Sequence, residues 1–93
     1  MNKIEKLIGK NVEVKNKWEI IILIRRKKNI SRAELRRIYN KKFNEDKTYM
    51  TFWRLENGKT PKSNIRIFYG ILEILGISVK DFLEYIENNK INL

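Results

Sequence analysis

Helical periodicity dominates this sequence and leaves little room for strands. In "KWEIIILIRRKKN" and "IRIFYGILEILG" apolar residues recur every three or four positions, whereas the alternation typical of strands extends no further than "VEV" at Val12 to Val14. The breakers are one proline and four glycines, and Gly58 and Gly76 each directly follow such a run, where glycine can end a helix. The pattern predicts an all-α fold of five main helices with short connections.

Residues that cap helices precede each of these runs. Ser, Thr, Asn and Asp accept hydrogen bonds from the free N–H groups of a first turn. The expected caps are Asn16, Ser31, either Asp46 or Thr48, either Ser63 or Asn64, and Ser78. Residues 1–15 are expected to form an N-terminal extension with one further helical turn, and residues 16–93 the main domain. The side chains expected to face inward include Leu35, Ile38, Tyr39, Phe52, Leu55, Ile65, Phe68, Leu72, Leu75, Val79, Phe82, Leu83 and Ile86.

The composition argues against most catalytic chemistry. A chain of 93 residues makes one modest core, and the absence of cysteine and histidine excludes disulfides, thiol chemistry, imidazole acid–base work and zinc sites. The adjacent acids Glu45 and Asp46 fall in an expected loop with no base or phosphate-cradling glycine loop near them. We therefore expect no enzyme, no cofactor and no metal. The longest apolar run, Ile20 to Ile24, is too short to span a membrane, which together with the lack of cysteine predicts a cytoplasmic protein.

Positive charge is concentrated in the middle of the chain. The net charge is +10, and residues 25–66 contain fourteen Lys or Arg against four Asp or Glu, while the flanks nearly cancel. A basic segment between near-neutral flanks is typical of a protein that binds a polyanion, most often DNA or RNA. The alternative is that surface lysines only keep the protein soluble.

Three stretches in this order resemble one family of DNA-binding domains. "LIRRKKNISRAELRRIYN", "TYMTFWRLENGKTP" and "ILEILGISVKDFL" are similar to the Cro/CI-type, or XRE-type, helix-turn-helix domain of lambdoid phage repressors, over residues 17–86. "RLENGKTP" and "LGISVKDFL" each match over several consecutive positions. The resemblance implies a five-helix lambda-repressor-like domain that binds double-stranded DNA and regulates transcription, most often as a repressor in a phage, plasmid or mobile element. It also implies a homodimer in the nucleoid.

The expected recognition helix spans residues 48–57. Because the major groove admits one helix, bases should meet the side chains that point away from Phe52 and Leu55. Arg54 can donate to guanine O6 and N7 together, and the resemblance implies that the positions of Tyr49, Met50 and Arg54 contact bases. Trp53 flanks this face, and its alternative role is to pack on a neighbouring loop. The expected base-contacting residues are Tyr49, Met50, Trp53 and Arg54.

Backbone contacts are expected on both sides of that helix. Phosphates fit free N–H groups at helix starts together with hydroxyls and cations nearby. The expected phosphate contacts are Ser31, Arg32, Thr48, Lys59, Thr60, Lys62 and Ser63. The family pairs an acid at the position of Glu56 with an arginine at the position of Arg25, so the resemblance implies a buried structural ion pair.

The sequence departs from the family between the second and third expected helices. Residues 40–47, "NKKFNEDK", lengthen the usual tight turn, and Arg36 stands where the family generally keeps alanine. We expect Phe43 to fill the widened gap between these two helices.

Two partners other than DNA follow from the apolar surface. The family pairs through its last helices, and the residues expected at such a dimer interface are Ile74, Val79, Tyr85 and Ile86. A second function remains open: an antitoxin or inhibitor on a helix-turn-helix scaffold that presents Tyr49, Met50 and Trp53 to a protein, because aromatic and Met side chains also suit protein interfaces.

Overall fold

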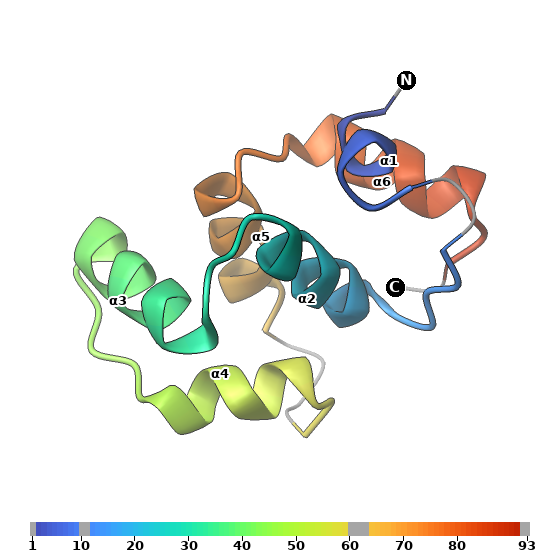
Figure 1. Ribbon diagram of the computed structural model, residues 1–93. Coiled ribbons are helices and arrows are strands. Elements are labelled where there is room, and N and C mark those ends of the chain that lie inside the picture. Colours follow the sequence, from blue (N-terminus) through green and yellow to red (C-terminus); the bar gives the residue numbers. More distant parts are fainter. Residues whose placement is uncertain (1, 10–11, 60–63, 92–93) are drawn as a thin grey trace.

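The structure describes residues 2–9, 12–59 and 64–91. Within these residues the chain forms six α-helices and no strand (Figure 1). The structure is a computed structural model. The all-α prediction is confirmed for this part of the chain. The helices are α1 (Lys3–Ile8), α2 (Lys17–Lys27), α3 (Arg32–Phe43), α4 (Tyr49–Glu56), α5 (Ile65–Ile74) and α6 (Val79–Asn88).

Local capping explains where the helices begin. The Asn16 side chain accepts hydrogen bonds from two N–H groups of α2, and Thr48 and Ser78 each accept one at the start of α4 and α6. Ser31 forms a reciprocal capping box with Glu34 at the start of α3. The predictions at Asn16, Ser31, Thr48 and Ser78 are therefore confirmed, with Thr48 rather than Asp46 as the cap of α4.

Two glycines end helices as predicted. Gly58 follows α4 with a φ of 67°, and Gly76 follows α5 with a φ of 74°. Both values lie in the left-handed region, which costs glycine no steric clash. The stop after α4 is thus a property of the local sequence.

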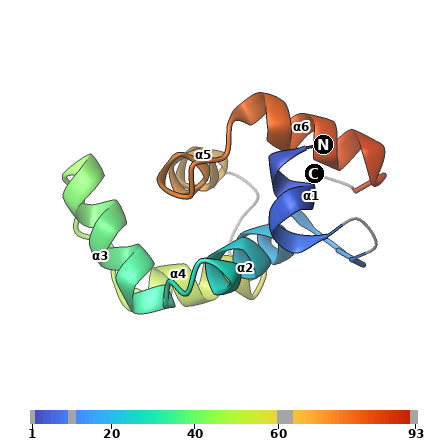
Figure 2. The same cartoon turned by 45° about the horizontal axis from the view of Figure 1, so that its top comes forward.

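The helices pack in a chain of pairs. α1 packs on α2 and α6, α2 packs on α4, and α3 packs on α4 and α5. α4 and α6 lie on opposite sides of the molecule in both views (Figures 1 and 2). The N-terminal helix belongs to the same body, since Ile4 of α1 is fully buried in the core.

One apolar core joins all these helices. Its fully or almost fully buried members include Ile4, Ile20, Ile21, Ile24, Leu35, Phe52, Leu55, Phe68, Ile71, Leu72, Leu75, Phe82 and Tyr85. Most of the side chains expected to face inward do so.

Four expected core residues are exposed instead: Ile38, Ile65, Val79 and Leu83. In α6 the buried stripe is Phe82, Tyr85 and Ile86, which leaves Val79 and Leu83 at its edge. Ile38 lies at the edge of the stripe that Leu35 and Tyr39 form in α3. Ile65 is the first residue of α5, and its side chain leans toward the N-terminal end of the helix, past its packed part.

The lengthened turn between α3 and α4 is partly helix. α3 continues to Phe43, so only residues 44–48 connect it to α4. The prediction for Phe43 is wrong in its location: the ring lies 4.7 Å from that of Tyr39 and against Gly70 of α5. A Cβ added to Gly70 would come within 3.0 Å of Tyr39 and 3.2 Å of Phe43, so the missing side chain lets α3 and α5 approach closely. Phe43 therefore fills a gap between α3 and α5, because the extra helical turn carries it away from α4.

Candidate nucleic-acid interface

α4 has one buried and one exposed face. Phe52, Leu55 and Glu56 are buried against the rest of the protein. Met50, Trp53 and Arg54 are exposed on the other face, Met50 and Trp53 by 46% and 36%. Tyr49 lies at the edge of this face, on the same side of α4 as Glu56 seven residues later, and is 42% exposed. All four expected base-contacting residues are thus exposed on one short helix.

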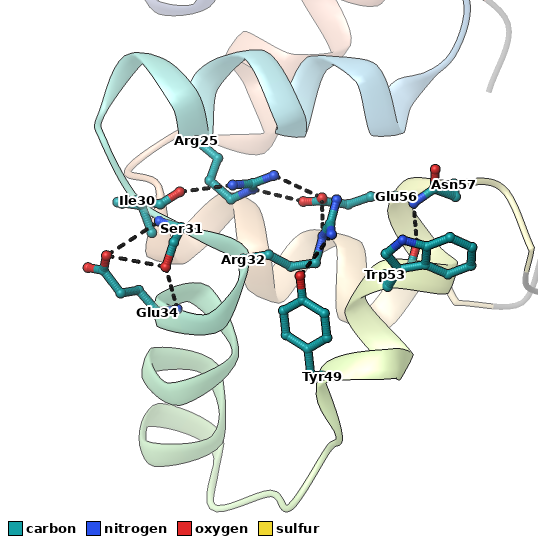
Figure 3. Close-up of polar contacts among 9 residues, drawn as sticks. All are labelled: Arg25, Ile30, Ser31, Arg32, Glu34, Tyr49, Trp53, Glu56 and Asn57. Atoms are coloured by element: carbon teal, nitrogen blue, oxygen red, sulfur yellow. Dashed lines mark hydrogen bonds and ion pairs between the residues drawn. The ribbon is translucent and has the colours of Figure 1, made fainter.

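A buried carboxylate fixes this helix from behind. Glu56 accepts hydrogen bonds from Nε and Nη2 of Arg25, both at 3.0 Å, and its side chain is only 2% exposed (Figure 3). Arg25 also donates from Nη1 to the carbonyl oxygen of Ile30, after the end of α2. The expected ion pair between Arg25 and Glu56 is confirmed. Its bidentate geometry specifies how α4 sits on α2.

A second arginine shares the same carboxylate, and sequence reasoning missed it. Nε of Arg32 donates to Oε1 of Glu56 at 2.8 Å, so α2, α3 and α4 meet at one side chain (Figure 3). The two residues are 24 positions apart, and no spacing in the sequence signals that they meet. Two cations on one anion leave a net positive charge beneath the exposed face of α4.

Arg32 also holds the first residue of α4. Its Nη1 donates to the hydroxyl of Tyr49 at 3.0 Å, and its guanidinium carbon lies 5.7 Å from the centre of that ring. Partial burial by itself lowers the pKa of Arg32, but the bonds to Glu56 and Tyr49 outweigh it and raise the pKa above its usual value. Arg32 therefore stays charged while it contacts α4 at both ends.

Polar contacts fasten the connection before α4. Asn40 donates to the carbonyl oxygen of Lys47 and accepts from the N–H of Lys47, both at 2.9 Å. Nε of Arg36 donates to the same carbonyl at 2.8 Å. Arg36 thus binds the backbone directly before the cap of α4.

The expected phosphate contacts are only partly described. Ser31 and Thr48 are exposed, and each caps the helix that follows it. Lys59 is exposed just after the end of α4. Thr60, Lys62 and Ser63 lie outside the described residues. Arg32 is half-buried and bonded to Glu56, so its place differs from that of a free surface cation.

The expected dimer surface needs a correction. Tyr85 is fully buried and Ile86 is 7% exposed, because both side chains fill the core of the protomer. Their side chains are therefore not part of the surface that a second copy would meet. Val79 is exposed, and Ile74 is partly buried against the core.

No protein-family model, curated protein or solved structure matches this chain. In the described part, no cluster of three or more acidic residues could hold a metal ion. Nor does any described helix have the length and apolar character needed to cross a bilayer.

Proposed function

We propose that this protein binds double-stranded DNA in a sequence-specific manner and regulates transcription as a repressor, with α4 in the major groove. The observation that supports this most is the pairing of an exposed face on α4 with a rigid polar support behind it. Tyr49, Met50, Trp53 and Arg54 are left uncovered, while Glu56 is held by two arginines. A reading helix needs this combination, because side chains can discriminate bases only when their backbone is held in place.

Charge favours DNA over other partners. Residues 25–66, which include α3 and α4, carry the excess of basic residues, whereas α6 and the segment after it are slightly acidic. Phosphate contacts need cations on the face that presents the reading helix. The order of the helices and the resemblance to Cro/CI-type domains support the same function.

The proposal includes a pair of copies on DNA. Val79 and Leu83 are exposed one helical turn apart on α6. We propose these residues for the contact between copies in place of Tyr85 and Ile86. A dimer of this kind predicts two inverted half-sites separated by about one turn of DNA.

Selection of bound sites from randomised duplexes tests the function directly. A recovered sequence with inverted half-sites would support it. Titrations at several salt concentrations would then compare the wild type with Arg54→Ala and Lys59→Ala. Loss of Arg54 should relax specificity at one or two base pairs by about 1–3 kcal/mol. Loss of Lys59 should weaken binding to every duplex and lower the salt slope by about one contact.

Lys6→Ala is the matched control, because Lys6 is exposed on α1, which lies away from α4 (Figure 1). It should leave both affinity and specificity close to wild type. If the wild type selected no sequence, or if its affinity hardly changed with salt, the DNA-binding proposal would be wrong.

A protein partner is the second candidate function. Tyr49, Met50 and Trp53 form an exposed group of side chains that are enriched at protein interfaces. An antitoxin or inhibitor could use the same face of α4. Its binding would depend weakly on salt and strongly on Trp53, which separates it from DNA binding.

A further inference from the structure

The guanidinium of Arg32 donates hydrogen bonds to two different side chains of α4. Its Nε donates to Glu56 at 2.8 Å and its Nη1 donates to Tyr49 at 3.0 Å. These two acceptors are seven residues apart and on the same side of α4, so side chains from its first and last turns converge on one planar group (Figure 3). A guanidinium in this position is held by the protein's own groups.

The hydrogen bond from Arg32 determines where the hydroxyl proton of Tyr49 points. An arginine side chain has only donors, so in this bond the phenol oxygen must be the acceptor. The proton of the phenol then points away from Arg32, and the ring is 42% exposed on the open face of α4. Tyr49 is thereby set to act as a hydrogen-bond donor toward whatever lies on that face.

We infer that Arg32 is a positioning residue, which presents the Tyr49 hydroxyl as a donor to an acceptor atom on a base edge, and that it is not a phosphate anchor. This inference rests on the proposed function, and it replaces the phosphate role expected from the sequence. Tyr49 is the first residue of α4, and the N-terminal residues of a reading helix are those that reach base edges.

As a hydrogen-bond donor, the Tyr49 hydroxyl can bond only to bases that present an acceptor. In the major groove the acceptors are N7 of the purines, O6 of guanine and O4 of thymine. The amino groups of adenine and cytosine are donors, and they would face a hydroxyl whose oxygen already accepts from Arg32. Tyr49 should therefore favour a position with an acceptor and disfavour the N4 amino group of cytosine.

Two conservative substitutions test this inference. Tyr49→Phe keeps the ring and removes the hydroxyl. Arg32→Lys keeps the positive charge but loses the planar fork that reaches Glu56 and Tyr49 together. The matched control is Arg37→Lys, an exposed arginine on the same helix. Circular dichroism melts would establish that each variant is folded at the titration temperature.

The readouts are the ratio of affinities for the selected and a scrambled duplex, and the salt slope. We expect Tyr49→Phe and Arg32→Lys each to lower this ratio by roughly two- to tenfold, the worth of one hydrogen bond. The double variant should lose about as much as either single variant, since both remove the same contact. Neither should change the salt slope, and Arg37→Lys should change nothing.

Several results would overturn the inference. The positioning role would be excluded if Arg32→Lys kept the wild-type ratio of affinities for the selected and scrambled duplexes. It would also be excluded if the losses of the two single variants multiplied in the double variant, or if a variant lost affinity equally for both duplexes. Arg32→Gln would exclude it too if it lowered the salt slope by about 0.9, as the loss of a phosphate contact does. If Arg32→Lys fails to fold, a wild-type ratio in Tyr49→Phe alone would suffice. A wild type that selects no sequence would instead reject the proposed function.

Discussion

The two ends of the molecule are held together by different kinds of interaction. Where α2, α5 and α6 meet, packed rings and aliphatic side chains predominate: Phe68 lies 5.1 Å from Trp18 and 4.8 Å from Phe82, measured between ring centres. The buried polar contact at this end is that of Asn2, which caps α1 and donates to the carbonyl oxygen of Asp81 at 2.8 Å. Apolar packing of this kind tolerates many substitutions of similar volume.

Where α3 and α4 meet, directional polar contacts are added to the apolar ones. Glu56 is bonded to two arginines, and the backbone of Lys47 is bonded to Asn40 and Arg36. A helix with one face open to a partner has packed neighbours on one side only. Hydrogen bonds of fixed geometry then supply the orientation that a second layer of packing would otherwise give. Apolar burial stabilises the fold at both ends, and at this end the polar contacts also specify the position of α4.

The largest expected effect comes from an isosteric change at the polar end. Glu56→Gln removes one negative charge and leaves Arg25 and Arg32 without a counter-ion near a site that is almost closed to water. Breaking a buried ion pair from one side costs about 3–5 kcal/mol. We expect a drop of that size in the free energy of unfolding, measured by denaturant titration.

Two controls make this comparison specific. Glu73→Gln removes an exposed acid whose ion pair with Lys42 is 3.7 Å long, and it should cost less than about 1 kcal/mol. Leu72→Met is the matching isosteric change in the apolar core and should cost less than about 1.5 kcal/mol. If Glu56→Gln were as mild as these two, the difference between the two ends would disappear.

A second prediction tests the extra turn of α3. Phe43→Ala should lower the free energy of unfolding by about 1–2 kcal/mol, less than for a fully buried ring, because Phe43 is half-buried against Tyr39 and Gly70. Ile38→Ala, at an exposed position of the same helix, is the control and should be nearly silent. A silent Phe43→Ala in the same denaturant titration would mean that the ring does not join α3 to α5.

Local chemistry explains which parts of the fold were predictable. Helix starts at Asn16, Ser31, Thr48 and Ser78 depend on one side chain and the next few N–H groups, so the sequence contains the whole signal. The exposed face of α4 follows in the same way, since the buried Phe52 and Leu55 determine which positions point outward. Helical spacing predicted these features because they involve only one helix.

Features that depend on two helices could not be predicted in this way. Periodicity gives the centre of a buried stripe but not its width, which is why Val79 and Leu83 were placed inside. The contact between Arg32 and Tyr49 depends on how α3 crosses α4. Phe43 was misplaced because the length of α3 could not be read from "NKKFNEDK". The spacing of Arg25 and Glu56 does not by itself indicate that they meet, and their pair was expected only from the resemblance to Cro/CI-type domains.

The smallest expected effect is a gain of stability, in contrast to the losses above, and it concerns Tyr85 at the apolar end. The hydroxyl of Tyr85 is buried and has no hydrogen-bond partner among the described residues. An unsatisfied buried hydroxyl costs free energy, so Tyr85→Phe should raise the free energy of unfolding at neutral pH by up to about 1 kcal/mol. Denaturant titration at pH 7 measures this, and a loss of stability would mean that the hydroxyl is satisfied after all.

The same substitution should change the response to alkali. Burial raises the pKa of Tyr85 above 10, and the negative charge of Glu5 adds to the rise. The folded state therefore holds this proton more tightly than the unfolded state, so its contribution is complete below about pH 10 and is lost as the pH rises through the folded pKa. In Tyr85→Phe the free energy of unfolding should fall less steeply above pH 10 than in the wild type. An identical decline in Tyr85→Phe and the wild type would show that burial of Tyr85 in the apolar core does not raise its pKa.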